Sequence, residues 1–396
     1  MGIQAVDELY EKYAAKWKEE IVSMREMIIA SLVMTAQIPA KTFNESARAG
    51  FILERLIEAG VNEPMIDEIG NVIAVIKGKS PKRKILLSAH LDTLFDGTLD
   101  HNVTITRNRA EGTAVADNAL GVTLLVTLPD IIKKLGLELD SDIILLGTVA
   151  SKEIGDLTGI RHFMKNFSHE IDYNINIEGI SLGQVDHSAL SRVRCDIKCS
   201  LEPERTSSWR DLGHSSAIMM LSDILENLFR IPLPHKPKTV MNVGRIQGGH
   251  SYSRVCGNAS LHLEVRSEDD SITEKLIDEI RDSCYEVGAK YGDDIDLNFF
   301  SRHHAAGIKY SHPLVSTAST IVKKLGIKPK MGPSNSEIAV PLSLGVPSIT
   351  IGLAAGSEDK SHRKSYVELD TIPDGIVQTL LLITSIDKGY CDDDNQ

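Results

Sequence analysis

The sequence has no apolar run long enough to cross a membrane, so an ordinary membrane-spanning protein is not among the expected classes. Its first 20 residues alternate charges at helical spacing and lack the hydrophobic core of a signal peptide. Only five cysteines occur, an odd number without CxxC spacing, and this usage is typical of a reduced compartment. We therefore expect a cytoplasmic protein with no membrane partner.

An excess of positive charge is also missing. The chain has 43 Lys and Arg against 55 Asp and Glu, which gives a net charge of −12. Nucleic acid and anionic membranes attract basic proteins, so neither is expected as a main partner. The remaining composition, 42% hydrophobic and 25% charged, is that of an ordinary globular protein. The length of 396 residues suggests two domains, or one domain with an insertion.

Short apolar runs that end in polar residues recur along the chain and predict buried strands. The expected strands are 72–76, 85–88, 142–147, 174–179 and 348–352. Between them we expect helices at 3–36, 44–60, 313–325 and 372–387, and a further helix after Asp117 that Pro129 interrupts. Strands that alternate with helices favour an α/β sheet, whose ligands bind beyond the carboxyl ends of the strands.

The pattern changes between residues 190 and 303. Strands are expected at 192–200, 261–266 and 295–300, with helices at 215–229 and 271–287 between them. This β-α-β-α-β order predicts a smaller α+β domain. It would be inserted into a larger α/β domain formed by residues 1–189 and 304–396.

The strand 85–88 leads into a group of residues suited to metal binding. His90 and Asp92 follow it two positions apart, which lets the carboxylate take the second imidazole N–H and fix the tautomer of a metal-binding histidine. Asp117, at a later turn that opens a helix, could add a carboxylate ligand. For His-x-Asp alone, a polar loop over the edge of a sheet is the alternative.

The order of several longer motifs resembles the M20 family of metallopeptidases, which includes aminoacylases, carboxypeptidases and di- and tripeptidases. The motifs are Gln37-Ile-Pro-Ala-Lys-Thr-Phe-Asn-Glu45, Asp67-Glu-Ile-Gly-Asn-Val-Ile73, Ser88-Ala-His-Leu-Asp-Thr93, Val115-Ala-Asp-Asn-Ala-Leu-Gly-Val122, Asn242-Val-Gly-Arg-Ile-Gln-Gly-Gly249, Glu264-Val-Arg-Ser-Glu-Asp269 and Pro341-Leu-Ser-Leu-Gly-Val-Pro347. The resemblance implies a mixed-sheet, zinc-peptidase-like catalytic domain with an inserted α+β lid or dimerisation domain. It also implies hydrolysis of an amide bond in a small peptide or an N-acyl amino acid.

By the same resemblance, the site holds one or two divalent ions, usually Zn2+. His90 would bind one ion and Asp92 would orient His90. Asp117 would bridge two ions, Glu178 would add a carboxylate to the first ion, and His362 would bind the second. These residue types suit zinc, and paired ions turn water into a nucleophile while they polarise the scissile carbonyl.

The chain departs from the family where two adjacent glutamates are expected, the general base and a metal ligand. In one register Glu153 is the ligand and Lys152 stands in the base position; in the other, Ser151 and Lys152 replace both glutamates. Neither register supplies the base, so Asp92, Ser151 and Lys152 are the candidate catalytic residues. A lysine ammonium is repelled by a nearby divalent ion. Lys152 must therefore be neutral, point away, or replace the second ion by pairing with a carboxylate such as Asp117.

Other family positions differ as well. The histidine that the inserted domain usually contributes to substrate binding is Ser207 here, although His214 lies nearby, and Arg266 is retained as a candidate substrate-binding or structural residue. The family's Ser-Thr-Asp loop reads Asn335-Ser-Glu337. Three functions stay open: a hydrolase with an altered site, an inactive M20-fold binding protein, and a repurposed single-metal enzyme that uses Lys152.

The resemblance further implies a homodimer that forms through the inserted domain. The expected helix at 215–229 carries Ile218, Leu221 and Leu225 on one face, and this face is the predicted partner contact.

Overall fold

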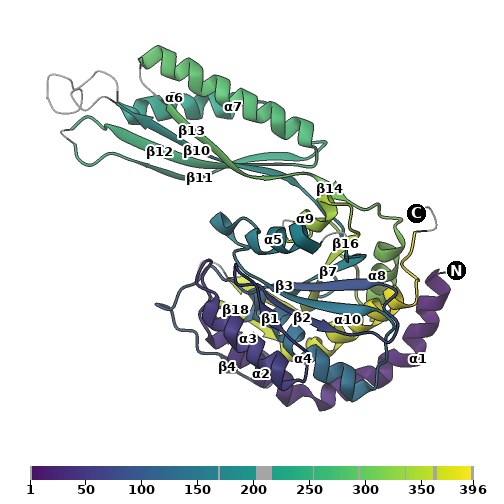
Figure 1. Ribbon diagram of the computed structural model, residues 1–396. Helices are drawn as coiled ribbons and strands as arrows, with labels where there is room; N and C mark the ends of the chain where they lie inside the picture. Colours follow the sequence, from purple (N-terminus) through teal and green to yellow (C-terminus); the bar gives the residue numbers. More distant parts are fainter. Residues whose placement is uncertain are drawn as a thin grey trace. The chain divides into compact units, whose positions relative to one another are not determined.

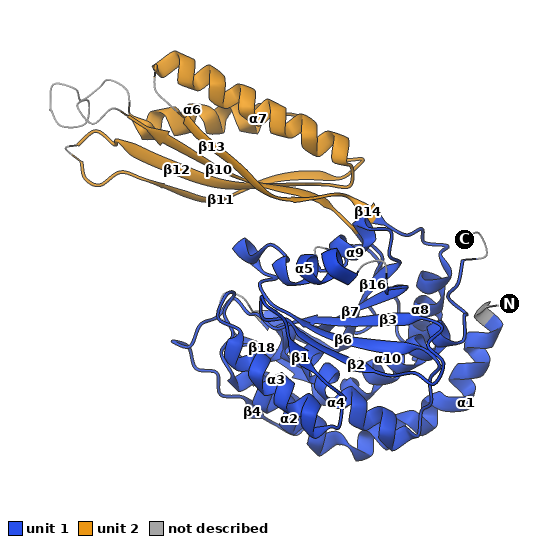
Figure 2. Cartoon of the chain, in the orientation of Figure 1, with its two compact units in different colours: residues 1–188, 307–396 blue, residues 189–306 orange. Residues whose placement is uncertain are grey.

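A computed structural model describes residues 2–167, 170–201, 216–252, 254–292, 295–334, 336–359 and 364–393. The chain forms two compact units (Figure 2). Unit 1 contains Met1–Ser188 and Gly307–Gln396, and unit 2 contains Ala189–Ala306. The insertion was expected at 190–303, and the structure has it at 189–306.

Unit 1 is built on a seven-stranded sheet with the order β1-β2-β6-β3-β7-β16-β8. The inner strands β6, β3, β7 and β16 are parallel, whereas β2 and β8 pair antiparallel to their neighbours. All residues of β6 and β16 are buried, as in strands covered on both faces. The strands are β1 (Met65–Ile66), β2 (Val72–Ile76), β3 (Lys84–His90), β6 (Asp142–Thr148), β7 (Tyr173–Ile180), β8 (Val185–Asp186) and β16 (Ser348–Ala354).

The two faces of this sheet differ in chemistry because successive side chains of a strand point to opposite sides. On β16, Ile349 and Ile351 belong to the main hydrophobic core, whereas Ser348 and Thr350 point to the other face. The same alternation gives β3 and β7 one apolar face and one polar face. The helices of unit 1 are α1 (Gly2–Ser23), α2 (Arg25–Gln37), α3 (Ser46–Glu58), α4 (Leu120–Leu135), α5 (Thr158–Phe167), α8 (Pro313–Lys324), α9 (Ala339–Ser343) and α10 (Ile372–Asp387).

Helices cover both faces of the sheet (Figure 1). Helices α4 and α10 pack on the apolar face, where α4 contacts β3 and β7 and α10 contacts β16. Helices α5 and α9 contact each other above the opposite, polar face. The polar face therefore lies beneath two short helices and their loops, and it carries the candidate site.

Three expected helices differ in detail. The helix predicted at 3–36 is two helices that meet at Met24. Met24 N donates a hydrogen bond to the Ile21 carbonyl in a tight turn, and Ser23 Oγ donates one to the Glu20 carbonyl. The helix predicted from Asn44 begins at Ser46. Pro129 does not interrupt α4, which runs from Leu120 to Leu135 and is held by burial of all its first nine residues.

Two helical segments are long and apolar enough to cross a membrane by length and composition, contrary to the expectation that no such run exists. They are Val115–Leu135 and Leu369–Asp387. In each, 83% of the apolar window is buried inside the structure, as in a core helix.

Unit 2 is a four-stranded antiparallel sheet with the order β11-β12-β10-β13 and two helices on one face (Figure 1). Its core contains Val193, Cys195, Ile197 and Cys199 of β10. Strand β11 was not predicted, because Gly244 and a bulge near it disturb the alternation of side chains. The elements are β10 (Ser191–Ser200), α6 (Ala217–Arg230), β11 (Thr239–Gly248), β12 (Asn258–Ser267), α7 (Asp270–Tyr291) and β13 (Ile295–His303).

The close approach of α10 to β16 depends on a glycine. A Cβ atom at Gly375 would lie 1.8 Å from the Leu353 carbonyl oxygen, which is main chain and cannot move independently. We expect Gly375→Ala to lower the free energy of unfolding by about 1–3 kcal/mol or more, as overpacking does. Urea unfolding followed by circular dichroism measures the change.

The matched control is Gly50→Ala in α3, where a Cβ atom would meet nothing within 4 Å. This substitution should raise the free energy of unfolding by about 0.5–1 kcal/mol, because alanine favours a helix over glycine. Equal effects of the two substitutions would contradict the proposed packing of α10 on β16.

Candidate metal centre

His90 and Glu178 come from neighbouring parallel strands of unit 1. His90 ends β3 and Glu178 lies near the end of β7. Ser88 pairs with Asn176 in the register of these strands, so residues two positions further along each strand point from the same polar face. Asn176 Nδ2 also donates to Glu178 Oε1 at 3.3 Å, which fixes the carboxylate at the carboxyl end of the sheet.

Asp117 joins this pair from the turn Val115–Ala119 that precedes α4. The neighbouring Asn118 Nδ2 donates to the Ile177 carbonyl at 2.7 Å, and this hydrogen bond ties the turn to β7. His90 Nε2 lies 2.9 Å from Asp117 Oδ1 and 3.8 Å from Glu178 Oε2. The three residues can each offer one ligand atom within 4.8 Å of the others.

The contact between His90 and Asp117 is a short ion pair whose atoms do not meet strict hydrogen-bond geometry. His90 Nε2 and Asp117 Oδ1 are both buried, and neither has a hydrogen-bond partner within the described part of the chain. Buried polar atoms are normally paired, so an unpaired nitrogen and oxygen that face one point indicate a missing common partner. One histidine and two carboxylates fit a divalent ion such as Zn2+.

The electrostatics of the group also favour a cation. Burial lowers the pKa of His90, as does Lys152, but Asp117, Asp92 and Glu178 outweigh both and hold the pKa of His90 well above its usual value. A proton on His90 is thus stabilised by the surrounding carboxylates. A metal ion at the same point would meet the same attraction.

Asp92 supports His90 in a way that differs in part from the expected one. His90 Nδ1 lies 2.9 Å from the main-chain oxygen of Asp92 and 3.6 Å from its carboxylate. The other carboxylate oxygen accepts hydrogen bonds from Thr42 Oγ1 at 2.8 Å and from the amides of Ser151 and Lys152 at 3.0 and 2.9 Å. Asp92 therefore orients His90 and also holds the Ser151–Lys152 segment.

Lys152 adopts one of its three expected arrangements, pairing with a carboxylate. Its Nζ lies 2.8 Å from Asp117 Oδ2, the oxygen that does not face His90. Burial lowers the pKa of Lys152, but Asp117 and Glu178 raise it above the usual value, so the side chain is an ammonium. Burial would raise the pKa of Asp117, yet Lys152 and His90 hold it below its usual range. Glu153 is exposed and lies outside the His90 group.

Glu337 was not predicted as a site residue, and the structure brings it to Ser151. Its side chain is 1% exposed and comes from the loop before α9. Glu337 Oε1 accepts a hydrogen bond from Ser151 Oγ at 2.7 Å and another from Thr148 Oγ1. Burial raises the pKa of Glu337. The only sequence signal for it was the altered loop Asn335-Ser-Glu337.

Of the four remaining predicted residues, the structure describes Arg266 alone. Ser207, His214 and His362 lie outside the described residues. Arg266 is on β12 of unit 2, where it pairs with Glu264, which also accepts a hydrogen bond from Arg194 Nε at 2.8 Å. Arg266 thus belongs to a charged group on the outer face of the unit 2 sheet.

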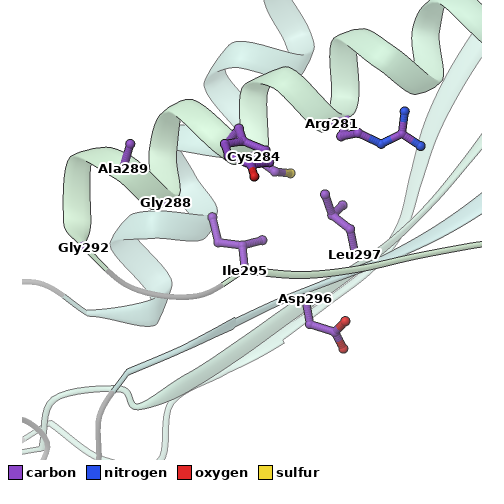
Figure 3. A pocket seen from close by; sticks show the side chains of 9 residues that line it. Arg281, Cys284, Gly288, Ala289, Gly292, Ile295, Asp296 and Leu297 are labelled. Atoms are coloured by element: carbon purple, nitrogen blue, oxygen red, sulfur yellow. The ribbon is translucent and has the colours of Figure 1, made fainter.

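Two further features of the described residues are separate from the His90 group. A surface cluster of Asp67, Glu68 and His162 could also offer three ligand atoms, but Asp67 Oδ1 already accepts three backbone amides. A cavity of about 640 Å³ opens in unit 2 between α7 and β13 (Figure 3). Ile295 and Leu297 point toward α7 there, whereas Asp296 points away, so the cavity does not gather candidate ligands.

Two family models match the chain. The model described as Peptidase family M28 matches residues 71–216, which include the three candidate ligands. The model described as Peptidase dimerisation domain matches residues 210–292 of unit 2.

Characterised relatives match part of the chain. Peptidase T of Limosilactobacillus fermentum is 25% identical over 274 residues, which cover 68% of this chain and 64% of that protein. Acetylornithine deacetylase of Vibrio parahaemolyticus is 29% identical over 225 residues, which cover 54% of this chain and 58% of that protein. The matched region thus spans less than two thirds of the length of either relative.

Solved structures match nearly all of the chain. A tripeptidase of Staphylococcus aureus has a TM-score of 0.76 at 16% identity, with 92% of this chain and 99% of that chain covered. A dinuclear metal-binding peptidase of the M20 family from Bacillus subtilis has a TM-score of 0.67 at 15% identity, with coverage of 92% and 99%. These likenesses show that the chain has the fold of M20-type peptidases, and unit 2 also matches the peptidase dimerisation domain.

Proposed function

We propose that the protein hydrolyses an amide bond of a small peptide or an N-acyl amino acid, with one divalent ion held by His90, Asp117 and Glu178. In this proposal the Lys152 ammonium takes the place of a second ion. The observation that supports it is the 2.8 Å contact between Lys152 Nζ and Asp117 Oδ2, on the side of Asp117 that faces away from His90. The relatives named Peptidase T and acetylornithine deacetylase support the substrate class.

Each side chain has a separate role in the proposed hydrolysis. A divalent ion at His90 would polarise the scissile carbonyl and lower the pKa of a water molecule. Asp92 keeps the His90 ring in place through the contacts at its Nδ1. Lys152 keeps Asp117 ionised and oriented, and its positive charge stabilises the oxyanion that develops as water attacks the carbonyl.

The same ammonium limits the number of ions. A second divalent ion about 5 Å from Lys152 Nζ would be repelled by several kcal/mol at an effective dielectric constant near 20. The second ion that Asp117 was expected to bridge would require this lysine to move or to lose its proton. The pKa of Lys152 is raised, which opposes loss of the proton.

A second candidate function is a binding protein that has kept the fold but has lost hydrolysis. The observation that favours it is that Ser151 and Lys152 supply no carboxylate where the general base is expected. A positioned general base contributes roughly 10²–10⁴-fold in rate, so a site without any substitute would be slow.

We also propose a homodimer that forms through unit 2, which matches the peptidase dimerisation domain. The expected contact face needs correction: Leu221 is 1% exposed and Leu225 packs against the core of unit 2, so neither is available to a partner. Ile218 and Met219 of α6 and Ile246 of β11 are exposed instead. Ile218 lies beside Gly248 of the edge strand β11, and we place the proposed contact patch at Ile218, Met219 and Ile246, next to a strand whose outer backbone groups can pair with another strand.

The proposed ion predicts a metal content. Protein that is stripped by a chelator and then reconstituted with Zn2+ should retain about one equivalent after gel filtration, because three ligand atoms converge. His90→Ala should retain less than about a tenth of an equivalent, measured by elemental analysis. His162→Ala, in the surface cluster, is the control and should bind like the wild type. Loss of zinc in His162→Ala but not in His90→Ala would refute the assignment.

The proposed role of Lys152 predicts the behaviour of two substitutions. Lys152→Met removes the charge and keeps the length, and it should lower the rate of hydrolysis of dipeptides or N-acyl amino acids roughly 10²–10³-fold. Lys152→Glu should bind a second equivalent of zinc, because a ligand replaces a repelling cation. Steady-state kinetics and elemental analysis measure the two effects.

The control for Lys152 is Lys77→Met, which breaks a similar 2.9 Å pair with the buried Asp142 outside the site. It should leave the kinetics unchanged. Brisk hydrolysis that persists in Lys152→Met would rule out an electrostatic role for the lysine. An unchanged metal content of Lys152→Glu would argue against the single-ion explanation.

The proposed dimer predicts a mass. Light scattering at micromolar concentration should give the mass of two chains for the wild type and of one chain for Ile246→Glu, because a buried unpaired charge opposes association. Tyr285→Glu is the control, since Tyr285 is 77% exposed on α7 outside the patch. A monomeric wild type, or a dimer that survives Ile246→Glu, would contradict the proposed interface.

A further inference from the structure

Glu337 places a carboxyl group beside the segment that lacks the family's glutamates. Its Oε1 accepts hydrogen bonds from two hydroxyl groups, Ser151 Oγ at 2.7 Å and Thr148 Oγ1. Its Oε2 is buried and has no hydrogen-bond partner within the described residues. Thr148 ends β6, and Ser151 follows it by three residues. Glu337 comes from a loop far away in sequence. It is the only carboxylate that contacts the Ser151 side chain in the described part of the chain.

Ser151 is held so that its hydroxyl can relay a proton. Its amide donates to Asp92 Oδ2 at 3.0 Å, and the other oxygen of Asp92 lies 3.6 Å from His90 Nδ1. Its Oγ–H points to Glu337, so the lone pairs of Oγ remain able to accept a proton from a neighbouring donor. Ser151 thus contacts both Asp92, which supports His90, and the Glu337 carboxylate.

We propose that Glu337, acting through the Ser151 hydroxyl, accepts the proton of the attacking water in the hydrolysis described above. This inference rests on the proposed function. Ser151 and Glu337 together would replace the single glutamate side chain that this position lacks. Glu337 is then a positioning residue and proton acceptor, and Ser151 is the group that meets the reactants.

The step balances without another reagent. One O–H bond of water breaks, and its proton goes to Ser151 Oγ while the Ser151 proton goes to Glu337 Oε1. The electron pair of the water oxygen forms a bond to the carbonyl carbon. When the C–N bond breaks, the proton returns along the same path to the nitrogen of the leaving amine. Glu337 and Ser151 end as they began.

The environment of Glu337 suits a base. Burial raises its pKa, which makes the carboxylate a stronger proton acceptor than an exposed glutamate. Two other charged groups influence it: His90 lowers the pKa and Asp92 raises it. The hydroxyl groups of Thr148 and Ser151 lower it as well, which keeps the carboxylate available at neutral pH.

The kinetic test uses the zinc-loaded protein with dipeptides and N-acyl amino acids. Glu337→Gln and Ser151→Ala should each lower kcat roughly 10²–10⁴-fold, as expected for loss of a base. The double variant should be no slower than the worse single variant, because the two residues act as one unit. The fall of kcat/KM at acidic pH, or acidic limb, should vanish in Glu337→Gln. It should return in Glu337→Asp, whose kcat should lie between those of the wild type and Glu337→Gln.

The control is Glu45→Gln. Glu45 is a second buried carboxylate nearby, 5% exposed, whose Oε1 accepts the Ala150 amide at 2.9 Å. This variant should lose stability but keep the acidic limb. A limb that persists in Glu337→Gln, or additive losses in the double variant, would overturn the inference.

A second readout does not need activity. In infrared difference spectra of the metal-free protein, a carboxyl group should titrate above the usual range of glutamate, disappear in Glu337→Gln and shift in Ser151→Ala. If the band behaves in this way but the wild type hydrolyses no substrate, the proposed function fails and the Ser151–Glu337 pair stands. If the band is missing or ignores Ser151→Ala, the inference fails whatever the activity.

Discussion

The carboxylate of Asp92 joins segments of unit 1 that are far apart in sequence, and the candidate site depends on it. It is fully buried and accepts hydrogen bonds from Thr42 and from the amides of Ser151 and Lys152, while its own main-chain oxygen faces His90. A buried charge is costly unless it is fully paired, so these partners must stay in place for the fold to persist. The conformation of the 151–152 segment and the orientation of His90 therefore both depend on the Asp92 residue.

A buried arginine also holds the backbone between His90 and Asp92. Arg48 is 0% exposed and donates to the carbonyl of Leu91 at 2.8 Å and to the carbonyl of Ile38. Burial lowers its pKa to about 10, and Asp92 and Glu45 act against that shift, so the guanidinium remains charged at neutral pH. The backbone of Leu91, between His90 and Asp92, is thus fixed by the Arg48 side chain, a contact that does not depend on a metal ion.

Much of this arrangement could be predicted because it follows from the pleat of a parallel sheet. His90 and Glu178 end neighbouring strands, and their alternation with apolar residues was visible in the sequence. Glu337 could not be found in this way, since its loop reaches Ser151 only after the chain has folded. The predicted partner face of α6 was wrong at Leu221 and Leu225, although Ile218 is exposed, because the helix packs these two leucines on its own sheet, and periodicity cannot distinguish such packing from a partner contact.

The charge around Asp117 links the residues at positions 151 and 152 in the proposed site. Asp117 presents one oxygen to His90 and the other to Lys152, so each half of the carboxylate faces a separate cationic position. With glutamates at 151 and 152, the same space would hold two more negative charges and would need a second divalent ion to balance them. An ammonium at 152 balances Asp117 by itself, and a neutral serine at 151 avoids an unpaired carboxylate beside it. Glu337 places one buried carboxylate beside Ser151, where two hydroxyl groups donate to it. In the proposed function, Ser151, Lys152 and Glu337 thus form one electrostatic arrangement, in which the Lys152 ammonium takes the place of a second metal ion.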